Sequence, residues 1–83
     1  MKVTVIRAHY VGEKMTQFEQ KEVTEQFVKN CADARNFFIG LGGLYKIKKD
    51  STGRVVFIES ISPDRKERAL DYFVYGDIEN AKD

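Results

Sequence analysis

The stretch from Val23 to Gly43 constrains the fold more than any other part of the chain. Thr24 suits the N-cap position of a helix, and Glu25 complements the positive end of the helix dipole. Gly40, Gly42 and Gly43 supply a helix stop. We therefore predict an amphipathic helix over residues 24–41. Six apolar side chains fall within an arc of roughly 80° on such a helix: Val23, Phe27, Cys31, Ala34, Phe38 and Leu41.

Four other segments have the composition of β-strands. Residues 2–11 are rich in β-branched side chains, and residues 15–22 predict a second, exposed strand. Residues 44–49 and 54–61 predict a hairpin, whose run Val55–Ile58 is typical of a strand covered on both faces or one whose outer face meets a partner. In the first strand we expect the more apolar face to point to the core, which is the face of Thr4, Ile6, Ala8 and Tyr10.

Residues 63–75 fit two structures. Ser62 followed by Pro63 is a helix start, and the apolar residues that follow make one arc. Tyr72–Tyr75 has high strand propensity, however, and residues 63–66 would then be a hairpin turn. We favour the helix.

The predicted fold class is α+β in two layers. A mainly antiparallel sheet of three to five strands packs against the helix 24–41, with a second helix near 63–75 toward the C-terminus. Residues 1–76 form a single domain, and residues 77–83 form a polar C-terminal tail.

Size, charge and cysteine content exclude several classes of protein. A chain of 83 residues is one domain. A net charge of +1 argues against a strong nucleic-acid binder and against a DNA mimic. The single Cys31 excludes an intramolecular disulfide and suits a reducing compartment. No run approaches the ~20 apolar residues of a membrane span. We expect a cytoplasmic protein that does not enter membranes.

The residues offer no catalytic set. Gly40, Gly42 and Gly43 lie at the end of the predicted helix, whereas the glycines of a phosphate loop precede a helix. Cys31 lies in the apolar stripe, and His9, the only histidine, is its only available base. Nothing with ligand spacing surrounds His9. We therefore expect a non-enzymatic protein with no metal, no cofactor and no small-molecule substrate.

Two surfaces are candidates for binding. Phe37 and Ile39 lie off the helix stripe, and Tyr72 and Tyr75 lie off the arc of the second helix, so these four predict a protein interface, including a homodimer. The alternative is a nucleic-acid interface on the basic hairpin 44–61. Its residues are Tyr45, Lys46, Lys48, Lys49 and Arg54.

The nucleic-acid alternative meets an objection from alternation. Lys46 and Lys48 fall on the face opposite Tyr45, so stacking and phosphate contacts would not share one surface. Lysines on an exposed edge strand also discourage aggregation. A module that binds another protein, or itself, is therefore our first hypothesis.

Asp33–Phe38 with Gly40–Leu41, and then Ile61–Arg65, resemble small uncharacterised proteins of bacteriophages and mobile elements of Gram-positive bacteria. The resemblance implies an accessory protein that binds and inhibits a host or defence protein. It assigns no role to any residue.

Overall fold

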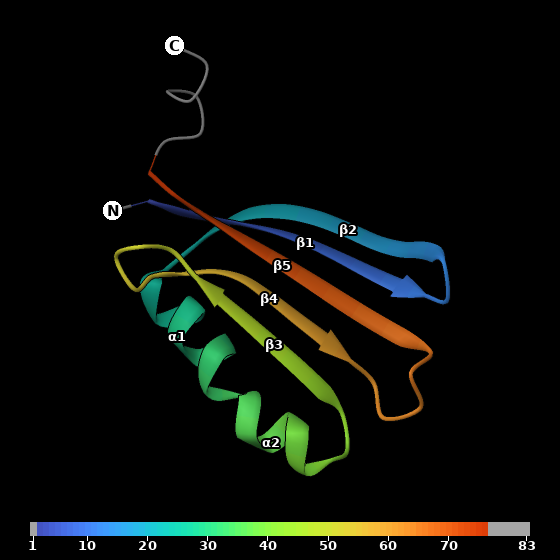
Figure 1. Cartoon of the computed structure of the whole chain (residues 1–83). Helices are drawn as coiled ribbons and strands as arrows, with labels where there is room; N and C mark the ends of the chain where they lie inside the picture. The colour runs from blue at the N-terminus through green and yellow to red at the C-terminus, as the bar shows by residue number, and fades with distance from the viewer. Residues whose placement is uncertain (1, 77–83) are drawn as a thin grey trace.

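Residues 2–76, which the computed structural model describes, form a five-stranded antiparallel sheet with two short helices on one side (Figure 1). Met1 and residues 77–83, which include the predicted polar tail, lie outside the described residues. The strands are β1 (Val3–Val11), β2 (Lys14–Val23), β3 (Leu44–Lys49), β4 (Val55–Ile61) and β5 (Glu67–Tyr75). The helices α1 (Glu25–Asp33) and α2 (Arg35–Gly40) lie between β2 and β3.

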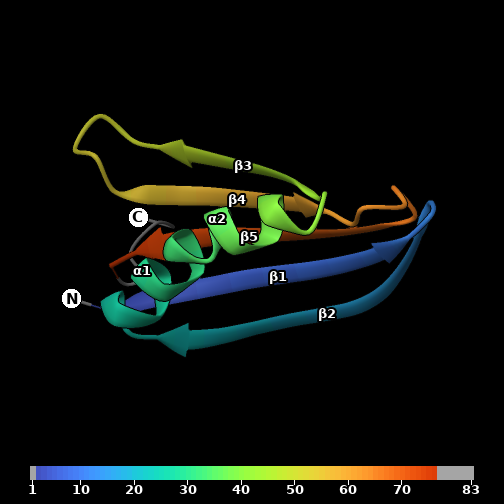
Figure 2. The ribbon, with the colours of Figure 1, turned by 90° about the horizontal axis from the view of Figure 1, so that it is seen from below.

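The strand at the centre of the sheet is β5, the last one in the chain. The strand order is β2-β1-β5-β4-β3, so β5 lies between the β1–β2 hairpin and the β3–β4 hairpin. Figure 2 shows this order with the helices in front of the sheet. The end of β5 lies beside the start of β1, where the Gly76 amide donates to the Lys2 carbonyl at 2.7 Å. The sheet therefore depends on pairing between segments from opposite ends of the described chain.

The core lies between the helices and one face of the sheet. Five apolar side chains of the described residues are buried there: Val3, Val5, Val28, Ile58 and Phe73. The predicted helix start is confirmed, because the Thr24 hydroxyl accepts a hydrogen bond from the Phe27 amide at 3.1 Å. The predicted helix is interrupted at Ala34, however, which divides it into α1 and α2. Its most deeply buried side chain is Val28, which is not part of the predicted apolar stripe.

The predicted second helix near 63–75 is wrong, and with it the predicted fold class. Within residues 2–76 the molecule is mostly sheet, with a single helical segment between Glu25 and Gly40. Ser62 and Asp64 do not cap a helix. The Asp64 carboxylate accepts from the Lys66 amide at 3.0 Å and from the Ser62 hydroxyl at 2.6 Å, which closes the turn before β5. Residues 67–75 form a strand and not a helix, because the strand gains a hydrogen-bonded neighbour on each side, β1 and β4.

The predicted core face of β1 is also wrong. The helices cover the face of Val3 and Val5, and of the four residues expected inside only Thr4 is buried. The reason is that the two polar residues on the covered face have partners. Arg7 donates to both carboxylate oxygens of Asp71, from Nε at 2.7 Å and from a terminal nitrogen at 3.1 Å. His9 contacts the Thr16 hydroxyl at 2.7 Å.

We expect Asp71→Ala to lower the free energy of unfolding by about 1–3 kcal/mol, because it leaves the half-buried guanidinium of Arg7 without its main partner. Urea denaturation followed by circular dichroism measures the loss. Glu19→Ala is the matched control. Glu19 lies 3.8 Å from the same guanidinium but is exposed, so its removal should cost at most about 1 kcal/mol. Equal losses in the two variants would contradict the role assigned to Asp71.

A second pair of substitutions tests the packing below α2. Gly43 is buried, and a Cβ there would collide with the ring of Phe38. We expect Gly43→Ala to destabilise the fold by about 1–3 kcal/mol. Gly40 lies at the end of α2 with open space where a Cβ would be, so Gly40→Ala should be neutral or stabilising by up to about 1 kcal/mol. Thermal unfolding of both variants checks this; similar shifts in melting temperature would contradict it.

Candidate functional site

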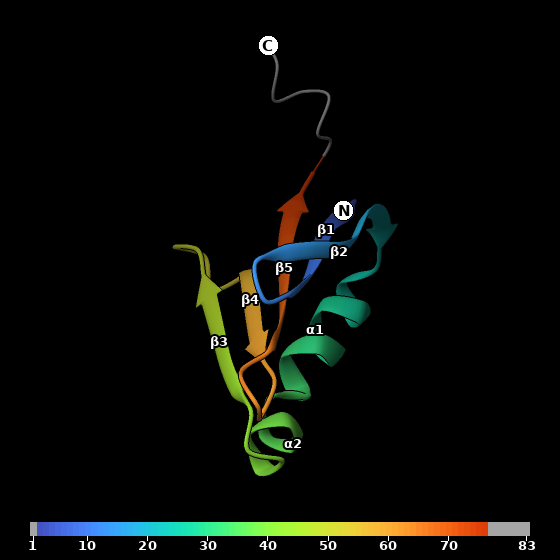
Figure 3. The same cartoon turned by 90° about the vertical axis from the view of Figure 1, so that its right-hand side faces the viewer.

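The candidate site is the face of the sheet that no helix of residues 2–76 covers, here called the open face (Figure 3). Alternation along each strand, combined with the cross-strand register, places its residues. In one row across the sheet, Ile6 lies beside Tyr72, and Tyr72 lies beside Phe57. The apolar residues of the open face are Ile6, Ala8, Tyr10, Met15, Phe18, Leu44, Phe57, Ile61, Leu70, Tyr72 and Val74.

Several of these side chains are widely exposed. Phe18 is 61% exposed and Tyr72 is 49% exposed, and the rings of Phe57 and Tyr72 pack with centroids 4.8 Å apart. An antiparallel sheet with one covered face normally turns polar residues to solvent on the other. Single exposed apolar residues are common, but here they adjoin one another across all five strands. A contiguous patch of this kind is typical of a binding surface.

Charged groups surround and cross this apolar patch. Lys48 lies over the Phe57 ring at 5.7 Å, near the β3 edge. Arg68 lies over the Tyr10 ring at 5.1 Å and also 3.9 Å from the Glu59 carboxylate. The cations therefore cover aromatic faces instead of standing apart from them. An apolar centre with a charged margin is the composition of protein interfaces.

The four predicted interface residues lie in three places. Tyr72 lies on the open face, whereas Phe37, 74% exposed, and Ile39, 44% exposed, lie on α2. Tyr75 lies on the helix-covered face, where its hydroxyl donates to the Val55 carbonyl at 2.8 Å. The structure therefore does not bring the four together on one surface.

Phe18 and Phe57 belong to the open face but were absent from the interface predicted from sequence. The apolar run of β4 was a signal for Phe57, because it fits a strand with a partner on its outer face. Phe18 lies on β2, outside that run.

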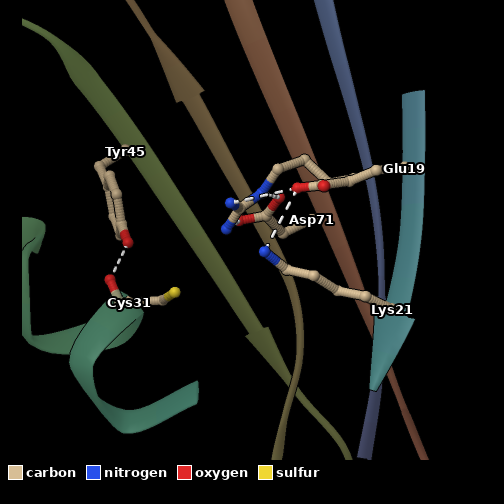
Figure 4. Close-up of polar contacts among 6 residues, drawn as sticks. Glu19, Lys21, Cys31, Tyr45 and Asp71 are labelled. Atoms are coloured by element: carbon tan, nitrogen blue, oxygen red, sulfur yellow. Dashed lines mark hydrogen bonds and ion pairs between the residues drawn. The ribbon is translucent and has the colours of Figure 1, made fainter. Parts of the chain in front are cut away.

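The predicted nucleic-acid residues are divided between the two faces. The Tyr45 hydroxyl donates to the Cys31 carbonyl below the helix, so this ring does not stack on the outside (Figure 4). Arg54 lies over the Tyr75 ring at 5.2 Å. Lys46 and Lys48 lie on the open face, and Lys49 lies at a break in the register of the β3–β4 pair.

The groups that could perform chemistry are engaged in the fold. Cys31 lies on α1 with its sulfur turned to the side of Asp71 (Figure 4). Burial raises the pKa of this thiol, which makes it a weak nucleophile at neutral pH. The second nitrogen of His9 lies 3.4 Å from the Glu67 carboxylate. Among residues 2–76, no three His, Cys, Asp or Glu side chains are grouped to hold a metal ion. Neither helix in this part of the chain is long and apolar enough to span a membrane.

The environment of Cys31 predicts a dependence of stability on pH. Because the folded pKa lies above the ordinary value of 9.0, the folded chain keeps a proton that the unfolded chain releases. This contribution to stability is complete at lower pH and is lost as the pH rises through the folded pKa. We expect the urea midpoint to fall more steeply above about pH 9 in the wild type than in Cys31→Ala. If the urea midpoint depends on pH in the same way in the two proteins, the role assigned to Cys31 is contradicted.

Comparison of the chain with protein-family models, with curated proteins and with solved structures found no match.

Proposed function

We propose that the chain is a non-enzymatic protein-binding module that uses the open face to hold another polypeptide. The observation that carries the proposal is the contiguous apolar patch centred on Phe18, Phe57 and Tyr72. Each large aromatic side chain that a partner covers removes on the order of 100 Å² from water, which stabilises a complex by about 2–3 kcal/mol. A few such contacts provide most of the affinity of a typical interface.

The class of partner follows from the resemblance of the sequence to small accessory proteins of bacteriophages and mobile elements. We propose a partner in the host cytoplasm and an inhibitory effect on that partner. The cytoplasm is a reducing compartment, which suits a protein with a single unpaired cysteine. Covering a functional surface of the target needs no chemistry from this chain.

Nucleic acid is the second candidate, and one observation favours it. Lys46 and Lys48 share the open face with the Phe57 and Tyr72 rings, so stacking and phosphate contact do not require opposite faces. Alternation placed Lys46 and Lys48 opposite Tyr45 correctly, but it considered β3 alone and therefore missed the Phe57 ring on the neighbouring strand. Against this candidate, Glu59 lies directly opposite Lys46, and the net charge of the chain is only +1.

Affinity capture from a bacterial lysate with tagged variants tests the proposal. Phe18→Glu and Tyr72→Glu place a charge on the open face, and we expect either to abolish retention of a protein that the wild type holds. Phe37→Glu is the matched control, because that side chain is equally apolar and more exposed but lies on α2. Circular dichroism verifies that each variant is folded. A partner that both open-face variants retain would contradict the proposal.

Lysate capture and a separate oligonucleotide titration distinguish the two candidate functions. In the lysate capture, a protein contact made by apolar side chains should survive nuclease treatment and an increase in salt. Binding to single-stranded or duplex oligonucleotides should weaken steeply with salt and be strongest near ~50 mM. Oligonucleotide binding at that salt that Lys48→Glu abolishes would favour nucleic acid, and no binding would end that candidate.

A further inference from the structure

We propose that the open face is the interface of a symmetric homodimer, in which two copies pack face to face about a two-fold axis that runs along β5. This inference rests on the proposed function and makes a second copy of the chain, in place of a host protein, the polypeptide that the open face of the free chain holds. Three features of the open face support it: its area, the position of β5, and the distribution of charge between its two edges.

The area of the open face suits a stable dimer. Nine residues of β5 span about 30 Å, and five strands about 4.8 Å apart give a sheet about 24 Å wide with its margins. The face therefore measures about 700 Å², close to the ~800 Å² that each partner contributes to a standard interface. Two sheets in contact would interdigitate their side chains in a second apolar layer about 10 Å thick.

The charges distinguish an axis along the strands from an axis across them. Lysines 46 and 48 lie at the β3 edge of the open face, and Gln20 and Glu22 lie at the β2 edge. An axis running across the strands would place β3 of one copy on β3 of the other, lysine against lysine. An axis along β5 exchanges the two edges, because β5 is the central strand, and places the lysine edge on the β2 edge.

The row that contains Tyr72 shows the fit in detail. Across the sheet this row reads Lys48, Phe57, Tyr72, Ile6 and Gln20. The axis places Tyr72 against Tyr72 of the second copy, Phe57 against its Ile6, and Lys48 against its Gln20. Glu22 is the next residue on the same face of β2, about 7 Å farther along, within reach of a lysine side chain.

One end of the axis carries a like-charge contact. Arg68 lies on β5 and meets Arg68 of the second copy, but each guanidinium lies near the Glu59 carboxylate of its own chain, at 3.9 Å. Arg68 also covers the Tyr10 ring on β1, at 5.1 Å. The repulsion between the two arginines is therefore weakened by the Glu59 carboxylate of each copy.

Sedimentation equilibrium of the full chain, with circular dichroism to check folding, tests the dimer. We expect the wild type and Phe37→Glu to dimerise with a dissociation constant of about 10 µM or tighter. Tyr72→Glu should raise that constant at least about 30-fold, because the axis brings two carboxylates together. A wild type that is monomeric at about 200 µM would overturn the homodimer. So would a Tyr72→Glu variant that dimerises as tightly as the wild type.

A charge exchange tests the direction of the axis. Lys48→Glu and Glu22→Lys should each weaken the dimer, and the double variant should recover most of the loss, because Glu22 lies within reach of Lys48 of the second copy. Failure of the double variant to recover would overturn the axis along β5.

A variant that ends at Gly76 tests residues 77–83 as an alternative occupant of the open face. If this variant dimerises while the full chain stays monomeric, the open face of the full chain is assigned to residues 77–83 and the homodimer is overturned. The lysate experiment remains independent. If the chain is monomeric but the open-face variants lose a captured partner, the proposed function stands and only the homodimer fails. If they lose nothing, the proposed function fails as well.

Discussion

The ion pair between Arg7 and Asp71 is the contact on which the arrangement of this sheet most depends. It joins β1 to β5, and β5 is the strand that connects the two hairpins. A slip of one residue would move Asp71 to the other face and leave Arg7 without its main partner, so the pair fixes the register. By holding the polar residues of β1 inside, it also turns the more apolar residues of that strand outward. The open face is thus a consequence of a charged contact within the core layer.

The elements that sequence reasoning identified are those with local signals. The strand over residues 2–11, the hairpin of residues 44–61 and the Thr24 cap are confirmed, because turn residues, strand propensity and a capping hydroxyl act within a few positions. The C-terminal segment could not be identified in this way. A serine and an aspartate flanking Pro63 stabilise either a helix start or a tight turn, and what decides between them is the pairing of β5 with β1, more than fifty residues away in sequence.

The composition of the candidate site was harder to infer than its existence. Tyr72 was selected because it lay off a helix that does not form, and it lies on the open face by virtue of strand register instead. Tyr45 and Tyr75 were expected outside, but each hydroxyl donates to a backbone carbonyl on the covered side. Alternation in a single strand assigns faces correctly, yet only the cross-strand register shows that Lys48 and Phe57 adjoin. That register is not encoded in either strand alone.

The position of β5 also has a consequence for synthesis of the chain. When a ribosome has completed residue 61, the nascent polypeptide contains the residues of both hairpins but lacks the strand that belongs between them. Neither hairpin is stable by itself in water. The domain therefore reaches its native arrangement only after β5 has left the exit tunnel and entered the gap, so completion of the fold is coupled to the end of translation of this segment.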